Sequence, residues 1–139
     1  MNPRHLAIVR STLATLAPAA DDVARRFYKR LFELDPRLRN LFKGDMSDQG
    51  RSLMAMIGAG VAGLDRMETL RPTLAALGAR HRGYGVRDLH YAVVAQALLD
   101  TLAVALGPAF TAEARVSWTE AYGVLAGGMR AGARIGLAS

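Results

Sequence analysis

The fold of this chain is organised around residues 70–91, which read LRPTLAALGARHRGYGVRDLHY. The first half predicts a helix, and Pro72 suits its first turn, where the missing N–H costs nothing. The apolar stripe of this helix follows helical spacing and ends in a histidine; its members are Leu70, Leu74, Leu77 and His81. Gly83 and Gly85 come next, as is typical past a helix end, and a second helix is predicted from about Leu89.

A helical histidine that faces an apolar interior, one turn from the helix end, suits a ligand of haem iron. Arg80 and Arg82 flank His81, and guanidinium groups can pair with haem propionates. The ring nitrogen that does not bind iron needs an acceptor, for which a backbone carbonyl near Leu77 is a candidate. Spacing alone nevertheless favours the plainer alternative, a core histidine that a neighbouring group satisfies.

The composition is that of one globular domain, which we expect to span residues 1–139. Hydrophobic residues make up 51% of the chain, which argues against disorder. The absence of cysteine excludes disulfides and cysteine nucleophiles and fits a reducing, cytoplasmic location. No apolar run approaches the roughly 20 residues of a membrane span. Because Arg10 interrupts the N-terminal apolar stretch, we interpret it as a first helix capped by Asn2, and not as a signal peptide.

The formal net charge is +6, and 16 of the 18 basic residues are arginine. A basic surface raises the question of a nucleic-acid partner. The arginines are scattered along the chain, however, without a dense basic run and without interleaved aromatic residues. We therefore interpret them as a solvated face and expect no binding of nucleic acid.

Proline and glycine separate a series of amphipathic segments, and no segment has the pattern of a strand. The expected class is therefore all-α, with seven to eight helices. Ser47 is predicted to cap a long middle helix, and Thr111 to open the last one. Gly58, Gly60 and Gly63 would each cost about 1 kcal/mol inside that middle helix, so we expect them to admit a closely crossing helix.

Two polar residues fall on apolar helix faces and are candidate ligand-binding groups. Tyr28 lies on the inward face of its helix, and a buried phenol needs a hydrogen-bond partner. Gln49 lies four residues before Leu53, so it shares that residue's face one turn earlier. The alternative is a buried Tyr28–Gln49 pair in an ordinary core.

The two remaining histidines are weaker candidates for a metal ligand. His90 could bind a metal by residue type, but it opens a helix beside Tyr91, where a solvated position or one near a propionate is expected. We interpret His5 as a surface residue near the N-terminus.

Four segments together resemble the bacterial single-domain globins and the globin domain of flavohaemoglobins. They occur in the same order and with the same spacing over nearly the whole chain. The segments are FYKRLFELDPRLRNLF, SDQGRSLMAMIGAGV, LGARHRGYGVRDLHY and WTEAYGVLAGGM.

The resemblance implies a globin fold, in which seven to eight crossed helices surround a pocket for haem b (iron protoporphyrin IX). It makes His81 the proximal iron ligand. It makes Tyr28 and Gln49 the distal hydrogen-bond donors to a bound gas, beside the apolar Leu53. Tyr122 matches a tyrosine of the last helix. The haem contacts that it implies are Phe42, Leu53, Ile57, Leu77, Arg80, His81, Tyr84, Val86, Tyr91 and Val94.

Two departures from the family pattern concern activity. Flavohaemoglobins carry a glutamate eleven residues after the position of Tyr122, where this chain has Ala133. The chain also ends at Ser139, without the length of a flavin and NAD reductase domain. Both departures argue against a dedicated dioxygenase.

Three classes of function follow. The expected one is reversible binding of dioxygen, for storage, delivery or sensing, with nitric oxide and carbon monoxide as further ligands. The second is a nitric oxide dioxygenase that works with a separate reductase. The third is a haem-free, basic helical binding module, which a Soret absorption band would exclude.

Overall fold

The computed structural model describes residues 1–83 and 85–138, with side chains described through residue 132. Over these ranges the chain is helical and contains no strand, which confirms the expected all-α class. The short helix expected after residue 35 is a 3₁₀ helix, so the α-helices number six in this part of the chain. The elements are α1 (Pro3–Leu16), η1 (Ala17–Ala19), α2 (Ala20–Leu34), η2 (Pro36–Leu41), α3 (Met46–Ala62), α4 (Met67–Gly83), α5 (Asp88–Leu106), η3 (Gly107–Ala109) and α6 (Ala112–Ala138).

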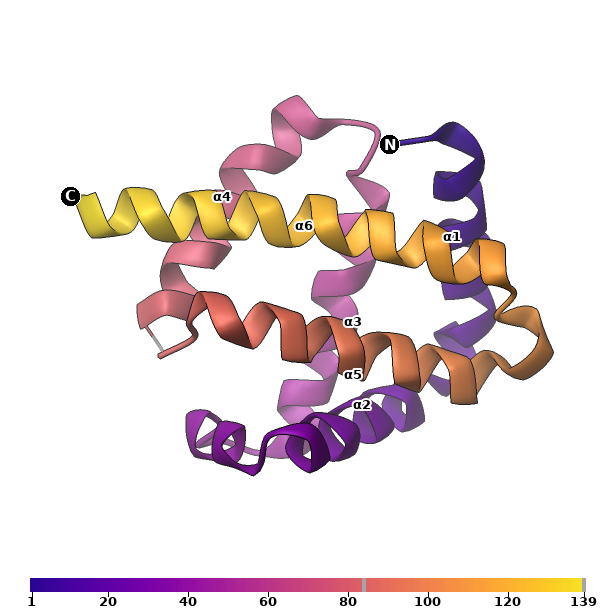
Figure 1. Cartoon of the computed structure of the whole chain (residues 1–139), viewed down its shortest axis with the longest axis horizontal. Helices are drawn as coiled ribbons and strands as arrows, with labels where there is room; N and C mark the ends of the chain where they lie inside the picture. Colours follow the sequence, from indigo (N-terminus) through magenta and orange to yellow (C-terminus); the bar gives the residue numbers. More distant parts are fainter. Residues whose placement is uncertain (84, 139) are drawn as a thin grey trace.

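The helices cross one another around one apolar core. In Figure 1, α5 and α6 run in opposite directions across the molecule, and α6 crosses α4. The helix α2 packs against both α5 and α3, and α1 packs against α6. The core side chains come from all parts of the chain. Six of them that are at most 4% exposed are Val9, Phe27, Leu31, Val61, Leu102 and Trp118.

Helix starts follow from side-chain caps. Asn2 and Thr111 cap α1 and α6 as expected, because the side chain of each accepts a backbone N–H from the first turn. The predicted cap of α3 is wrong: Asp45 caps this helix, and its carboxylate accepts the N–H groups of Ser47 at 2.7 Å and Asp48 at 3.2 Å. An anionic cap satisfies two amides and also suits the positive end of the helix dipole.

The helix α4 begins earlier than expected, at Met67, so Pro72 lies inside it rather than in its first turn. The N–H of Leu70 donates to the carbonyl of Arg66 at 3.0 Å, which starts the helix ahead of the proline. Proline at this position removes one hydrogen bond to the carbonyl of Glu68. Both residues are exposed, so water can replace that bond.

The glycines of α3 do not admit the backbone of a crossing helix, so that expectation was wrong. No described heavy atom lies within 4 Å of where a Cβ on Gly58 would be. Gly60 and Gly63 face the leucine side chains of Leu125 and Leu70, at 3.1 Å from a built Cβ in each case. Leucine side chains, and not the backbone of another helix, therefore occupy the space beside these two glycines.

The closest crossing joins α4 and α6 instead. A Cβ on Gly78 of α4 would overlap the carbonyl group of Met129. A Cβ on Gly132 of α6 would overlap the carbonyl group of Ala75. Each helix therefore presents a glycine to the backbone of the other, one turn before His81.

The segment 88–109, which contains α5 and η3, is long and apolar enough to cross a membrane by length and composition alone, with a mean hydropathy of 1.6. This departs from the expectation that no run approaches such a length. Ala97, Leu98 and Leu102 of the same helix are buried in the core, which accounts for part of its apolar character.

Candidate functional site

His81 lies in the last turn of α4, and its side chain is half-buried. Its Nδ1 is 2.7 Å from the carbonyl oxygen of Leu77, the acceptor that the sequence suggested. Because a carbonyl oxygen can only accept, Nδ1 must carry the hydrogen. In the neutral ring the lone pair is then on Nε2, which is the tautomer that a ligand of haem iron requires.

The other two histidines are engaged differently. His90 Nδ1 accepts the N–H of Arg87 at 3.0 Å and so caps α5. An accepting Nδ1 places the hydrogen of the neutral ring on Nε2, which leaves His90 no lone pair for a metal. His5 Nδ1 lies 2.6 Å from a carboxylate oxygen of Glu120, in a part-buried contact between α1 and α6 rather than free at the surface. His81 is therefore the histidine whose described contacts suit iron ligation.

The turn after α4 lies against η2. The N–H of Val86 donates to the carbonyl of His81 at 3.0 Å and closes the end of the helix. Gly85 has a φ of 98°, which glycine adopts without strain, and a Cβ there would lie 3.2 Å from Cδ2 of Leu41. The turn that follows His81 is thus close to the end of η2, directly before Phe42.

Tyr28 and Phe42 meet where α2 faces η2 and α3. Their ring centroids are 5.3 Å apart in an edge-to-face arrangement. The Tyr28 hydroxyl donates to the main-chain carbonyl of Gln49 at 3.4 Å, a long and therefore weak hydrogen bond. Burial raises the pKa of Tyr28 to about 12, so the phenol stays protonated and can donate at neutral pH. The structure thus brings three of the predicted site residues together.

Gln49 is the fourth residue of α3 and is half-buried. Its Nε2 lies toward the preceding loop, 4.0 Å from where a Cβ on Gly44 would be. The contact with Tyr28 therefore uses the main-chain carbonyl of Gln49 and not its side-chain amide. The next residue, Gly50, holds α3 against α2, since a Cβ there would be 3.0 Å from Cβ of Ala24.

The predicted apolar haem contacts share an intermediate burial, in contrast to core residues such as Val61, which is 2% exposed. These half-buried side chains are Phe42, Leu53, Ile57, Leu77, Val86 and Val94. Arg80 is exposed, and Tyr91 is buried. Tyr84, also predicted to contact haem, lies outside the described residues.

The residues present fit a haem. In the described part of the chain, no group of three or more histidine, cysteine, aspartate or glutamate side chains could hold a metal ion. One imidazole with its lone pair on Nε2 would be sufficient to hold a haem, because the porphyrin itself would supply the remaining nitrogen ligands of the iron. Half-buried apolar side chains suit the faces of the macrocycle, and an exposed arginine suits a propionate.

A second polar group joins α5 and α6. The Tyr122 hydroxyl donates to the carbonyl of Tyr91 at 2.6 Å, and the guanidinium of Arg130 lies 4.9 Å from the centroid of the Tyr91 ring. Burial raises the pKa of both tyrosines, and the charge of Arg130 opposes that rise. The sequence analysis missed Arg130, which lies eight residues after Tyr122, about two turns further along the same helix. The side chain of Ala133 lies outside the described residues.

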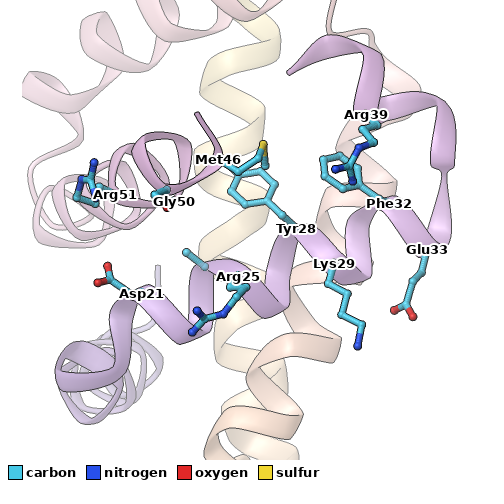
Figure 2. A pocket seen from close by; sticks show the side chains of 12 residues that line it. Asp21, Arg25, Tyr28, Lys29, Phe32, Glu33, Arg39, Met46, Gly50 and Arg51 are labelled. Atoms are coloured by element: carbon cyan, nitrogen blue, oxygen red, sulfur yellow. The ribbon is translucent and has the colours of Figure 1, made fainter. Parts of the chain in front are cut away.

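A cavity of about 590 Å³ lies between α2, η2 and the start of α3 (Figure 2). Tyr28 points from α2 toward Met46 and lines this cavity. Charged side chains of both signs surround it: Asp21, Arg25, Lys29, Glu33, Arg39 and Arg51. The Tyr28 ring therefore borders a cavity that charged residues of α2, η2 and α3 also line.

Comparison with known families gives the class of this protein. The model of the family described as Globin matches residues 25–129, which include Tyr28, Gln49 and His81. The chain belongs to the globin family, and the resemblance seen in its sequence is confirmed.

Two curated relatives are flavohaemoproteins. That of Bacillus subtilis is 30% identical over 129 residues, which are 91% of this chain and 32% of that protein. That of Rhizobium meliloti is 33% identical over 122 residues, 86% of this chain and 30% of that protein. The chain thus spans about a third of the length of the curated relatives it matches.

Solved structures show the same fold. An engineered carbene transferase from Rhodothermus marinus, provisionally named a nitric oxide dioxygenase, has a TM-score of 0.88 at 25% identity and covers 99% of this chain and 96% of its own. A bacterial globin from Campylobacter jejuni has a TM-score of 0.87 at 21% identity, with 99% and 100% covered. Because the Campylobacter jejuni globin is only 21% identical, its similarity shows a shared fold and nothing further.

Proposed function

We propose that this globin holds haem b and binds dioxygen reversibly, with nitric oxide and carbon monoxide as further ligands. The observation that carries the proposal is the 2.7 Å contact between His81 Nδ1 and the Leu77 carbonyl, which leaves the lone pair of the neutral ring on Nε2. When bound, the haem would supply a ferrous iron that takes up a diatomic gas. Besides His81, the residues that would hold it are Phe42, Leu53, Ile57, Leu77, Arg80, Tyr84, Val86, Tyr91 and Val94.

Tyr28 would be the main hydrogen-bond donor to the gas. Its hydroxyl is protonated at neutral pH, and its 3.4 Å bond to the Gln49 carbonyl costs little to exchange for a better acceptor. Gln49 would be the second donor, although its amide must first turn away from Gly44. Phe42 packs against the Tyr28 ring and limits its movement.

A second candidate function is nitric oxide dioxygenase activity with a separate reductase as partner. The flavohaemoprotein relatives and the Rhodothermus marinus protein support it. Ala133 counts against efficient turnover, because alanine cannot supply the carboxylate that flavohaemoglobins carry there. We also propose a cytoplasmic location and no nucleic-acid partner, on the absence of cysteine and the scattered arginines.

Absorption spectra of the purified protein, reconstituted with equimolar haemin, test this function. We expect a Soret band that shifts on reduction and shifts again with each of dioxygen and carbon monoxide. A protein that retains no haem after gel filtration would contradict the proposal and favour a haem-free binding module. Steady-state consumption of nitric oxide with a supplied reductase separates the two haem-dependent functions.

A further inference from the structure

Arg130 of α6 is a half-buried cation, and none of the described side chains forms an ion pair with it. Its guanidinium lies 4.9 Å from the centroid of the Tyr91 ring, a distance typical of a cation–π contact. Its Nε is buried and has no hydrogen-bond partner among the residues that the structure describes. Natural proteins rarely leave a buried donor unsatisfied, so this side chain requires an explanation.

The α4–α6 crossing brings the backbone of Arg130 close to the helix end that carries His81. Gly78 contacts the backbone of Met129, the residue before Arg130, and His81 follows Gly78 by three residues on α4. Gly132, two residues after Arg130, contacts the backbone of Ala75. Because backbone meets backbone at both glycines, the spacing between the two segments cannot vary much.

Within residues 1–83 and 85–132, no acidic side chain pairs with Arg130 to cancel its charge. The groups that face it are the buried phenol of Tyr91 and, about two turns earlier on α6, the half-buried phenol of Tyr122, whose hydroxyl donates to the Tyr91 carbonyl. Burial raises the pKa of both phenols, so both are neutral at physiological pH. Asp88, the acid that also acts on Tyr91, lies in the first turn of α5.

We propose that Arg130 lies on the His81 side of the haem. Its positive charge, which no described residue neutralises, favours the ferrous over the ferric state of the iron. The proposal rests on the proposed function. Oxidation of the iron adds one positive charge, which a nearby cation opposes. At an effective dielectric constant of about 20, a unit charge roughly 10 Å away changes such an equilibrium by about tenfold. Because dioxygen binds ferrous iron, Arg130 would protect the gas-binding state against oxidation.

The test is the midpoint potential of the haem protein, measured by spectroelectrochemistry. Arg130→Gln and Arg130→Met remove the charge, and methionine also keeps an apolar stem on the Tyr91 ring. Each substitution should lower the ferrous-to-ferric ratio about tenfold, which corresponds to a fall in the midpoint potential of about 59 mV for one electron. Arg130→Lys keeps the charge and should stay close to the wild type. The haem content of each protein and its thermal unfolding are measured first.

Arg115→Gln is the matched control. Arg115 lies on the same helix, with its guanidinium 5.2 Å from the centroid of the Phe110 ring, but it is exposed and fifteen residues away. That is roughly 22 Å along an α-helix, so its replacement should leave the potential unchanged.

The outcomes separate the two proposals. Wild-type protein without haem would overturn the proposed function. Normal haem content with an unchanged potential in both neutral variants would overturn the role of Arg130 alone. A midpoint potential that falls as far in Arg130→Lys as in Arg130→Gln would also overturn the role of Arg130, because packing and not charge would then be responsible.

Discussion

Gly78 and Met129 meet backbone to backbone, so closely that a Cβ on the glycine would overlap the methionine carbonyl. Gly132 makes the reciprocal contact with the backbone of Ala75, so the spacing of α4 and α6 at their crossing cannot vary much. His81 lies one turn beyond this crossing on α4. The position of the candidate iron ligand therefore depends on two glycines that bear no chemistry of their own.

Gly78→Ala and Gly132→Ala should each lower the free energy of unfolding by roughly 1–3 kcal/mol or more, because the added methyl group forces two helices apart. Gly127→Ala is the matched control on α6. No described atom lies within 4 Å of its built Cβ, and it should stabilise the helix by roughly 0.5–1 kcal/mol. Urea unfolding followed by circular dichroism measures all three. Equal effects at the three sites would show that the crossing is looser than described.

Tyr28→Phe should speed the release of dioxygen about ten- to a hundredfold, as expected for loss of a hydrogen bond worth roughly 1.5–3 kcal/mol to a partly charged acceptor. Gln49→Leu should change it less, because the Gln49 amide lies toward Gly44 and must reorient. Carbon monoxide carries less charge on its outer atom, so its release should respond weakly to both changes. Stopped-flow dissociation rates measure these effects. A larger effect of Gln49→Leu would make the glutamine the main donor.

Tyr28 should also make the fold sensitive to alkali. An unfolded tyrosine ionises at a pKa near 10, whereas burial raises the pKa of Tyr28 to about 12. Between these values the unfolded chain has lost a proton that the folded chain keeps, so the free energy of unfolding falls as pH rises. Two pKa units correspond to about 2.7 kcal/mol, and Tyr28→Phe should remove this share of the decline. Urea unfolding at increasing pH compares the two proteins; identical declines would rule out the assignment to Tyr28.

With a foreign reductase at saturating level, the protein should turn over nitric oxide more slowly than a flavohaemoglobin does. Ala133 provides no carboxylate to act on His81, and Arg130, three residues earlier in the chain, adds a positive charge at the Tyr91 ring instead. The measurement is steady-state nitric oxide consumption per haem with an electrode. Turnover equal to that of a flavohaemoglobin assayed alongside would refute this prediction and favour the dioxygenase.

The sequence predicted the helices and the candidate ligand because both depend on local patterns. The stripe that ends in His81 and the acceptor at Leu77 lie four residues apart on one helix, where periodicity is reliable. Asp45 took the place of Ser47 as a cap because an anionic side chain two residues earlier satisfies two amides.

Relations between distant segments could not be predicted in this way. The glycines of α3 and those of α4 and α6 look alike in sequence, and only the packing shows which of them meet a backbone. Arg130 was missed for the same reason, since its partner Tyr91 is on another helix. The contact of Tyr28 with the main chain of Gln49, rather than with its amide, also depends on how α2 and α3 cross.

The central claim, that His81 is the iron ligand of a haem protein, is tested most directly by the Soret spectrum of His81→Gly with and without added imidazole. His90→Gly is the matched control, because His90 uses its Nδ1 to cap α5. We expect His81→Gly to lose the wild-type ferrous spectrum and to recover it when imidazole is added, while His90→Gly keeps it throughout. Loss of the spectrum in His90→Gly, with His81→Gly unchanged, would contradict the account.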